Sequence, residues 1–248
     1  MAQIRIENVR KDFGTFNAVK SSTFTIEDGE FFMLLGPSGC GKTTTLRMMA
    51  GLELPTSGEI YIDGEEVGQK PASQRDIAFV FQMFALYPHM NVRKNISYPL
   101  LSQGMARPQV RKKVAEVAEI LGITDILERP VGGLSGGEEL RALHDRMGAT
   151  TVYVTHDQLE AMQMGDKIVV MNHGVVEQFG VPQDIYDWPA TRFVAQFIGS
   201  PSMNFLEFNG TVGNGAEHVS LGETRFAVPR QLAGASGALT LGVRPEHV

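Results

Sequence analysis

The stretch Gly36-Pro37-Ser38-Gly39-Cys40-Gly41-Lys42-Thr43 decides the fold of this 248-residue chain. It fits the pattern G-x-x-x-x-G-K-[ST], in which backbone N–H groups of a glycine-rich loop surround phosphate groups. An apolar run at residues 31–35 precedes it and indicates a buried strand, and apolar residues at helical spacing follow it. A strand, a glycine loop and a helix in this order aim a helix N-terminus at a phosphate chain. The chain is therefore predicted to bind a nucleoside triphosphate.

Two side chains of this loop have chemistry suited to that ligand. Lys42 is placed to reach the outer phosphates, and the hydroxyl of Thr43 is placed to bind Mg²⁺. The alternative is a glycine-rich turn with an incidental Lys-Thr pair. The predicted strand and helix on either side of the loop count against that alternative.

Composition narrows the class of protein. With a net charge of −6, the chain offers no excess of basic residues, so we expect no nucleic-acid partner. Cys40 is the single cysteine, which excludes an intrachain disulfide and favours a reducing compartment. The apolar runs are far shorter than a membrane span, and residues 1–5 lack the apolar segment of a signal peptide. We therefore expect a soluble cytoplasmic protein, which still allows attachment to a membrane protein.

Two further apolar runs end in polar residues. Residues 77–81 are predicted to form a second buried strand that ends at Gln82, and residues 151–155 a third that ends at His156. Because ligands of open α/β sheets bind beyond the carboxyl ends of the strands, both side chains are expected to face the phosphate loop. An alternative stays open for each: a surface glutamine at a strand end, and a histidine with a structural role.

The rest of the chain predicts antiparallel and helical parts. The expected elements are a ribbon of residues 3–9 and 24–26 with a turn at 13–15, a strand at 58–64, a helix at 108–121 and a hairpin at 168–179. A second glycine-rich helix start, Leu134-Ser135-Gly136-Gly137-Glu138, is suited to an anion. A lone S-G-G is more often a loop, but two such helix starts in one chain are more informative.

With these pieces in order, the chain resembles the nucleotide-binding subunit of an ABC transporter, in particular the sugar-importer ATPases of the maltose and glycerol-3-phosphate type. Phe13 falls where the family has an aromatic residue that stacks on adenine, and residues 36–43 match its Walker A loop. Gln82 matches the Q-loop glutamine, residues 134–137 the signature, and His156 the switch histidine. Residues 200–205 and 242–247 resemble the start of the small β domain of importer ATPases.

This resemblance implies an α/β fold. The fold expected is a P-loop NTPase of the ABC type, with an antiparallel β subdomain and a helical subdomain, followed by the start of a small β domain. The implied boundaries are 1–195 for the nucleotide-binding domain and 196–248 for the first part of a truncated, OB-like regulatory domain.

The resemblance also implies ATP and Mg²⁺ as ligands. Thr43 and Gln82 would hold Mg²⁺, and Lys42, Gln82 and His156 would act in hydrolysis. The residues expected to contact ATP are Phe13, Gly36, Pro37, Ser38, Gly39, Cys40, Gly41, Lys42, Thr43 and Thr44 from one copy, and Ser135, Gly136 and Gly137 from the other copy of a homodimer. Each copy would thus complete the site of its twin across a self-complementary interface.

Further partners follow from the same resemblance. Residues 82–90 would contact a membrane permease, which places the protein on the inner face of the cell membrane. A periplasmic or extracellular binding protein would be an indirect partner. The alternative for residues 87–90 is an ordinary surface loop.

The chain departs from the family between the signature and His156. The family has there a signature helix, a strand ending in Asp-Glu that carries Walker B and the catalytic base, and a loop with another Asp. Here residues 139–148 alone fill the interval, which is short by roughly forty residues judged by typical element lengths. Asp157 is no substitute for the missing carboxylates, because it follows the histidine.

Two explanations of the short interval compete. A true deletion removes a central strand and leaves backbone groups of a parallel sheet unpaired, at a cost of several kcal/mol. We favour the other, in which the numbering closes over a segment that the protein possesses. In that case the Cα atoms near Gly137, Glu138 and Glu139 are predicted to lie much further apart than the roughly 3.8 Å of a peptide link.

Three functions are therefore compared. The first is a transport ATPase that powers uptake of a sugar or related polar solute, and polyamine, sulfate and iron importers have similar ATPases. The second is a nucleotide-binding regulator without turnover, which the missing carboxylates favour. The third, an ABC-type ATPase of DNA repair or translation, is disfavoured by the acidic charge and the importer-like C-terminal stretch.

Overall fold

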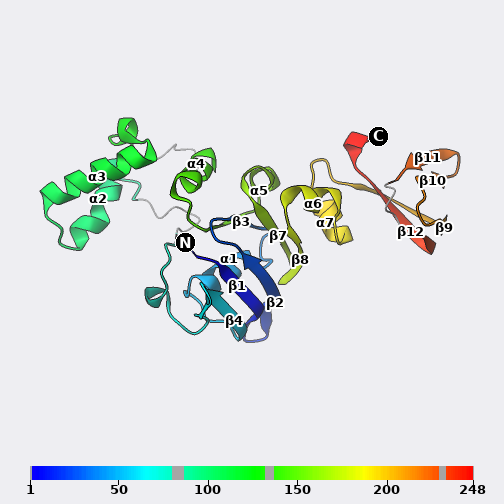
Figure 1. The fold of residues 1–248 in the computed structure, drawn as a ribbon, viewed down its shortest axis with the longest axis horizontal. Coiled ribbons are helices and arrows are strands. Elements are labelled where there is room, and N and C mark those ends of the chain that lie inside the picture. The colour runs from blue at the N-terminus through cyan, green and yellow to red at the C-terminus, as the bar shows by residue number, and fades with distance from the viewer. Residues whose placement is uncertain (1, 80–86, 132–136, 229–232, 248) are drawn as a thin grey trace. The chain divides into compact units, whose positions relative to one another are not determined.

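The computed structural model describes residues 2–79, 87–131, 137–228 and 233–247, and it divides into two compact units, Met1–Phe179 and Gly180–Val248 (Figure 1). The strands are β1 (Ile4–Phe13), β2 (Phe16–Ile26), β3 (Phe31–Leu35), β4 (Ser57–Ile62), β5 (Glu65–Glu66), β6 (Thr151–Thr155), β7 (Lys167–Asn172), β8 (Val175–Gly180), β9 (Asn204–Val212), β10 (His218–Leu221), β11 (Thr224–Ala227) and β12 (Ala235–Val243). The helices are α1 (Lys42–Met49), α2 (Val92–Ser102), α3 (Arg107–Leu121), α4 (Gly137–Met147), α5 (Gln158–Met164), α6 (Pro182–Asp187) and α7 (Arg192–Phe197), with 3₁₀ turns η1 (Ala72–Gln74), η2 (Thr124–Ile126) and η3 (Pro245–His247).

Among its described residues, the first unit is organised by an eight-stranded sheet in the order β5-β4-β1-β2-β8-β7-β3-β6. The strands β1, β2, β4 and β5 pair antiparallel, whereas β3 pairs parallel with both β6 and β7. The predicted antiparallel ribbon and the predicted parallel core are thus both present. They lie in the same sheet, where β2 meets β8 in a parallel pair at Ser21 and Val175.

The centre of the core is β3, whose residues Phe31–Leu35 are all fully buried. An uninterrupted apolar strand of this kind suits a position with neighbours on both sides. A core cluster continues from β3 onto α1, where Met48 and Met49 are buried, and onto β1, β2 and β4. The phosphate loop therefore starts from a fully buried strand of the unit.

The predicted second buried strand at residues 77–81 is wrong in its described part. Residues 77–79 are not strand, and Ala78 is exposed. A buried parallel strand needs a hydrogen-bonded strand beside it. In the described sheet the last strand next to β3 is β6, and no strand formed by residues 77–79 pairs with it. Local apolar character was therefore not sufficient to make a strand here, and residues 80–86 lie outside the described residues.

The strand β6 confirms the prediction for residues 151–155, but not its burial. Thr151, Val152, Tyr153 and Val154 are each only half-buried, and Thr155 alone is buried. The cause is the terminal position of β6, which pairs with β3 on one side and with no strand of the described residues on the other.

Helix α4 is continuous from Gly137 through Glu138 and Glu139 to Met147. No widened Cα spacing occurs along this helix, and the presence of a further segment near residues 137–139 stays a prediction. This one helix spans the short interval before β6. Its Arg141 forms an ion pair with Asp166, and the ring of its His144 lies against the ring of Phe31.

A small helical pair forms a second core. The helix predicted at residues 108–121 is α3, which buries Val110, Val114 and Ala118 at the three- to four-residue spacing of one helix face. These residues cluster with Val92 at the start of α2 and with Leu127. This pair is the helical subdomain that the resemblance implied.

In the second unit, β9 and β12 form a long antiparallel ladder from Asn204–Val243 to Val212–Ala235. The two stretches that resemble an importer β domain therefore lie side by side. Arg244 is buried, stacks over Tyr186 at 3.9 Å and donates to its carbonyl oxygen. Among the described residues of the whole chain, no helix has the length and apolar content needed to cross a bilayer.

Candidate functional site

The glycine loop joins the buried strand β3 to helix α1 through three glycines with positive φ. The φ angles are 151° at Gly36, 76° at Gly39 and 106° at Gly41. Gly41 is the N-cap of α1, in a left-handed conformation and without a side-chain cap. The first N–H groups of α1 are therefore left without a side-chain acceptor, as an anion-binding helix start requires.

Two of these glycines are also required by close packing. A Cβ atom at Gly36 would lie 2.2 Å from the carbonyl oxygen of Met171, and one at Gly41 would lie 2.6 Å from that of Ala18. At Gly39 a Cβ atom would meet nothing within 4 Å. Gly36 and Gly41 are thus pressed against β7 and β2, whereas Gly39 belongs to the open side of the loop.

The loop has a supported rear and an exposed front. At the rear, Cys40 is buried, and its carbonyl oxygen accepts a 3.0 Å hydrogen bond from the N–H of Gly174. At the front, Ser38, Gly39 and Thr43 are exposed, and Pro37 and Thr44 are half-buried. Thr43 follows Lys42 in the first turn of α1, so its hydroxyl is accessible to a ligand.

The ammonium group of Lys42 turns back into the loop. It donates to the carbonyl oxygens of Gly36 at 2.6 Å and of Pro37 at 2.9 Å, and it lies 3.7 Å from the sulfur of Cys40. Lys42 is buried, with 8% of its surface exposed. Its positive charge therefore lies inside the ring of backbone groups that surrounds a phosphate in loops of this type.

His156 lies at the same edge of the sheet as the loop. Leu35 at the end of β3 is paired with Thr155 at the end of β6, so Gly36 and His156 both follow the carboxyl ends of neighbouring strands. The next residue, Asp157, caps α5 by accepting from the N–H groups of Leu159 and Glu160. This agrees with the expectation that Asp157 does not replace the missing carboxylate.

Phe13 ends β1 opposite Phe16, and 47% of its surface is exposed. The ammonium group of Lys11 lies 4.8 Å from the centre of its ring. The exposed ring is accessible to a planar base.

Other predicted site residues are only partly described. Gln82, Ser135 and Gly136 lie outside the described residues, and Gly137 is the first residue of α4. In the predicted permease-contact region, Tyr87 is exposed and its ring lies 4.8 Å from that of Tyr98.

Sequence analysis did not indicate Arg75, a buried cation at the end of α1. Arg75 donates to the carbonyl oxygens of Met48 at 2.7 Å and Met49 at 2.6 Å, and also to those of Lys70 and Gly68. These bonds satisfy the end of α1, whose carbonyl groups lack helical partners. Burial lowers the pKa of Arg75. Its partners lie up to 27 residues away in the chain, so no local motif could have indicated them.

Comparison with known families and proteins identifies the relatives of this chain. Residues 19–146 match the family model "ABC transporter", and residues 199–248 match "MalK OB fold domain". The chain is 43% identical to the trehalose/maltose import ATP-binding protein MalK of Thermococcus litoralis, over all of this chain and 79% of that protein. It is 42% identical to the trehalose import ATP-binding protein SugC of Mycobacterium tuberculosis, over all of this chain and 73% of that protein.

These alignments also measure a length difference. The alignment with the Thermococcus protein covers 294 positions, and this chain has 248 residues, so at least 46 positions have no counterpart here. The same subtraction for the Mycobacterium protein, 291 positions against 248 residues, leaves at least 43. These relatives are therefore longer within the aligned region. The difference is close to the roughly forty residues by which the interval before β6 is short.

Solved structures support the fold. An ATP-binding cassette, MJ0796, in a dimeric post-hydrolysis state bound to ADP and Pi is 26% identical, with a TM-score of 0.58 over 72% of this chain and 98% of that chain. A second cassette, MJ1267, is 18% identical and agrees in fold, with a TM-score of 0.63 over 78% of this chain and 98% of that chain. The predicted P-loop fold followed by a small β domain is thereby confirmed. The chain belongs to the ABC transporter family and, with its full-length relatives, to the ATP-binding subunits of that family.

Proposed function

We propose that this chain is the ATP-hydrolysing subunit of an importer for a sugar or a related polar solute. The observation that carries the proposal is the glycine loop between β3 and α1, with Lys42 inside it, in a chain 43% identical to a trehalose/maltose import protein. The sn-glycerol-3-phosphate import protein UgpC of Rhodopseudomonas palustris is also 43% identical, over all of this chain and 75% of that protein. Both relatives import small polyhydroxylated solutes according to their names.

In this proposal the nucleotide lies across the front of the loop. Phe13 stacks on adenine, and the backbone of residues 36–44 together with the ammonium group of Lys42 binds the phosphates. Lys42 leaves the carbonyl oxygens of Gly36 and Pro37 and transfers its N–H bonds to phosphate oxygens. His156, at the same sheet edge, binds the outermost phosphate and orients the attacking water.

Magnesium fits the donors that the chain provides. The exposed hydroxyl of Thr43 in the first turn of α1 is a hard oxygen ligand of the kind that Mg²⁺ accepts alongside phosphates and water. Gln82 is proposed as the second protein ligand. An ion held by Thr43 and Gln82 would neutralise part of the negative charge of the phosphates.

A second copy of the chain completes the site. The outermost phosphate held by the partner copy is proposed to bind residues 135–137. One nucleotide then contacts the glycine loop of one copy and residues 135–137 of the other. A dimeric cassette among the solved structures supports this arrangement.

Residues 82–90 are proposed to contact the permease on the inner face of the membrane, with a solute-binding protein acting on the far side. The domain boundary at 195/196 remains a proposal: the OB-fold match that begins at residue 199 supports it, whereas the two compact units divide between Phe179 and Gly180.

A second candidate is a nucleotide-binding regulator without turnover. It is favoured by the interval before β6, which α4 alone fills, and by the lack of any described strand that ends in Asp-Glu. We propose that the segment present in relatives and absent here lies at residues 137–139. In that arrangement the chain binds ATP but lacks the carboxylate that activates water.

Steady-state phosphate release by the purified chain, measured with ATP and Mg²⁺, decides between the two. Import ATPase function requires turnover that Lys42→Ala abolishes, and Lys42→Ala should also weaken ATP binding by about 10- to 100-fold. Lys113→Ala, an exposed lysine on α3, is the matched control. ATP binding without phosphate release supports the regulator, and absence of ATP binding refutes both.

A further inference from the structure

Lys11 lies between the ring of Phe13, which is expected to stack on adenine, and helix α1, whose N-terminus is expected to bind the phosphates. Lys11 and Phe13 are two residues apart on β1, so their side chains leave the strand on the same face. The ammonium group lies 4.8 Å from the centre of the Phe13 ring, a distance at which a cation is attracted to the electron-rich face.

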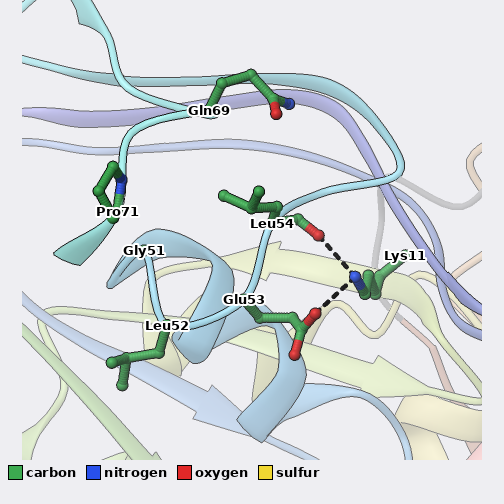
Figure 2. Close-up of a pocket in the computed structure, with 7 residues that line it drawn as sticks. All are labelled: Lys11, Gly51, Leu52, Glu53, Leu54, Gln69 and Pro71. Carbon is green, nitrogen blue, oxygen red and sulfur yellow. Dashed lines mark hydrogen bonds and ion pairs between the residues drawn. The ribbon is translucent and has the colours of Figure 1, made fainter.

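The ammonium group is held in this place by two acceptors on one loop. It lies 2.7 Å from a carboxylate oxygen of Glu53 and donates to the carbonyl oxygen of Leu54, also at 2.7 Å. Figure 2 shows both interactions, at the edge of a surface hollow of about 470 Å³ that residues 51–54, Gln69 and Pro71 line with Lys11. Only 13% of the Lys11 side chain is exposed, so its charge is partly shielded from water.

The loop that holds Lys11 is fixed to helix α1. The N–H groups of Leu52 and Glu53 both donate to the carbonyl oxygen of Arg47, at 2.9 and 3.2 Å. A chain of short polar contacts therefore runs from the Phe13 ring through Lys11 and Glu53 to the helix that begins with Lys42. These contacts link the ring to the helix that follows the phosphate loop.

We propose that Lys11 is a positioning residue of the nucleotide site: it supports one face of Phe13, so that the ring presents its other face to an adenine base at a set distance from the phosphates. The inference rests on the proposed function. The ammonium group draws π density towards itself, which lowers repulsion between the ring and a base stacked on the opposite face. Because the ring is already held in place, binding the base costs less ordering.

The test compares a ligand that has a base with one that has none. Calorimetric titrations of the full chain with MgATP and with magnesium tripolyphosphate should show that Lys11→Met raises the Kd for MgATP by about three- to tenfold. The Kd for tripolyphosphate should stay within about 1.5-fold. Lys11→Arg retains a cation and should bind MgATP within about twofold of the unmodified chain.

Two controls separate positioning from charge. Lys11→Met combined with Glu53→Gln keeps the net charge of the chain and should lose MgATP affinity like Lys11→Met alone. In a Phe13→Leu background, Lys11→Met should cause no further loss, because the ring through which Lys11 acts has been removed. Thermal unfolding of each variant identifies any change that comes from a damaged fold.

Two results overturn the inference. Equal weakening of MgATP and tripolyphosphate binding by Lys11→Met assigns Lys11 to the phosphates, and unchanged MgATP binding assigns it to the loop alone. If the unmodified chain binds tripolyphosphate but gains nothing from the base, the Phe13 site is refuted. If it binds neither ligand, the proposed function fails at its first step.

Discussion

Arg75 donates to the carbonyl oxygen of Met49 at 2.6 Å and so caps the end of the helix that starts at Lys42. A guanidinium group at the C-terminus of a helix lies at the negative end of the helix dipole and satisfies carbonyl groups that have no helical partner. The same residue also binds the carbonyl oxygens of Gly68 and Lys70. Arg75 therefore joins α1 to the chain segment that leads towards Gln82.

Arg75→Met should reduce the free energy of unfolding by about 3 kcal/mol, because four buried or partly buried carbonyl oxygens each lose a guanidinium hydrogen bond. Urea unfolding followed by circular dichroism measures the change. Arg111→Met on the exposed face of α3 is the control and should stay within about 0.5 kcal/mol of the unmodified chain. Equal stability of the two variants would contradict the capping role.

Gly36→Ala should destabilise the chain more than Gly39→Ala, although both glycines have positive φ. The added Cβ at residue 36 would lie 2.2 Å from a backbone oxygen of Met171, whereas at residue 39 it meets nothing. We expect losses of about 3 kcal/mol and about 1 kcal/mol, respectively. Thermal denaturation of the two variants side by side provides the measurement, and the reverse order would refute the packing argument.

Ser22→Ala should increase the free energy of unfolding by about 1 kcal/mol. The Ser22 hydroxyl is fully buried on β2, and within the described residues it has no hydrogen-bond partner. Removing an unsatisfied buried hydroxyl removes a desolvation cost. Thr45→Val is the contrasting variant, because the Thr45 hydroxyl is buried but donates to the carbonyl oxygen of Gly41 at 3.0 Å. That variant should lose stability, and a loss for Ser22→Ala as well would reveal an acceptor or a bound water.

Tyr153 should make the stability of the chain fall above pH 10. Burial, and then the negative charge of Glu160, raise the pKa of Tyr153 above its ordinary value of 10.0. Between that value and the raised pKa, the unfolded chain loses the phenolic proton while the folded chain retains it, so folding becomes less favourable as pH rises.

Urea midpoints at pH 9 and pH 11 test this dependence. The unmodified chain should lose more stability over this interval than Tyr153→Phe, which has no proton to release. Tyr98→Phe, at an exposed tyrosine of α2, should follow the unmodified chain. Identical losses in all three proteins would rule out a contribution from Tyr153.

The features predicted correctly depend on local pattern. The glycines around Cys40, the helical spacing from Val110 to Ala118, and the alternation along β1 each set local structure through residues close in the chain. Residues 36–43 also identify the loop by spacing alone, and the structure adds the direction of Lys42 within it.

The features missed depend on neighbours far away in the chain. Residues 77–79 have the composition of a strand but no partner strand beside them among the described residues, and β6 is half-exposed for the same reason. Lys11 and Arg75 act through residues 43 and 26 positions away, so their roles arise only when the sheet and α1 come together.

The position of β6 has a consequence for handling the protein. Its five residues, Thr151–Thr155, are uncharged and rich in β-branched side chains, and they end the sheet without the lysine or proline that commonly discourages edge-to-edge association. Such a strand is a template for cross-β growth at high concentration. Among the described residues no strand covers this edge, so we expect a charged residue in place of Val152 or Val154 to raise the solubility of the chain.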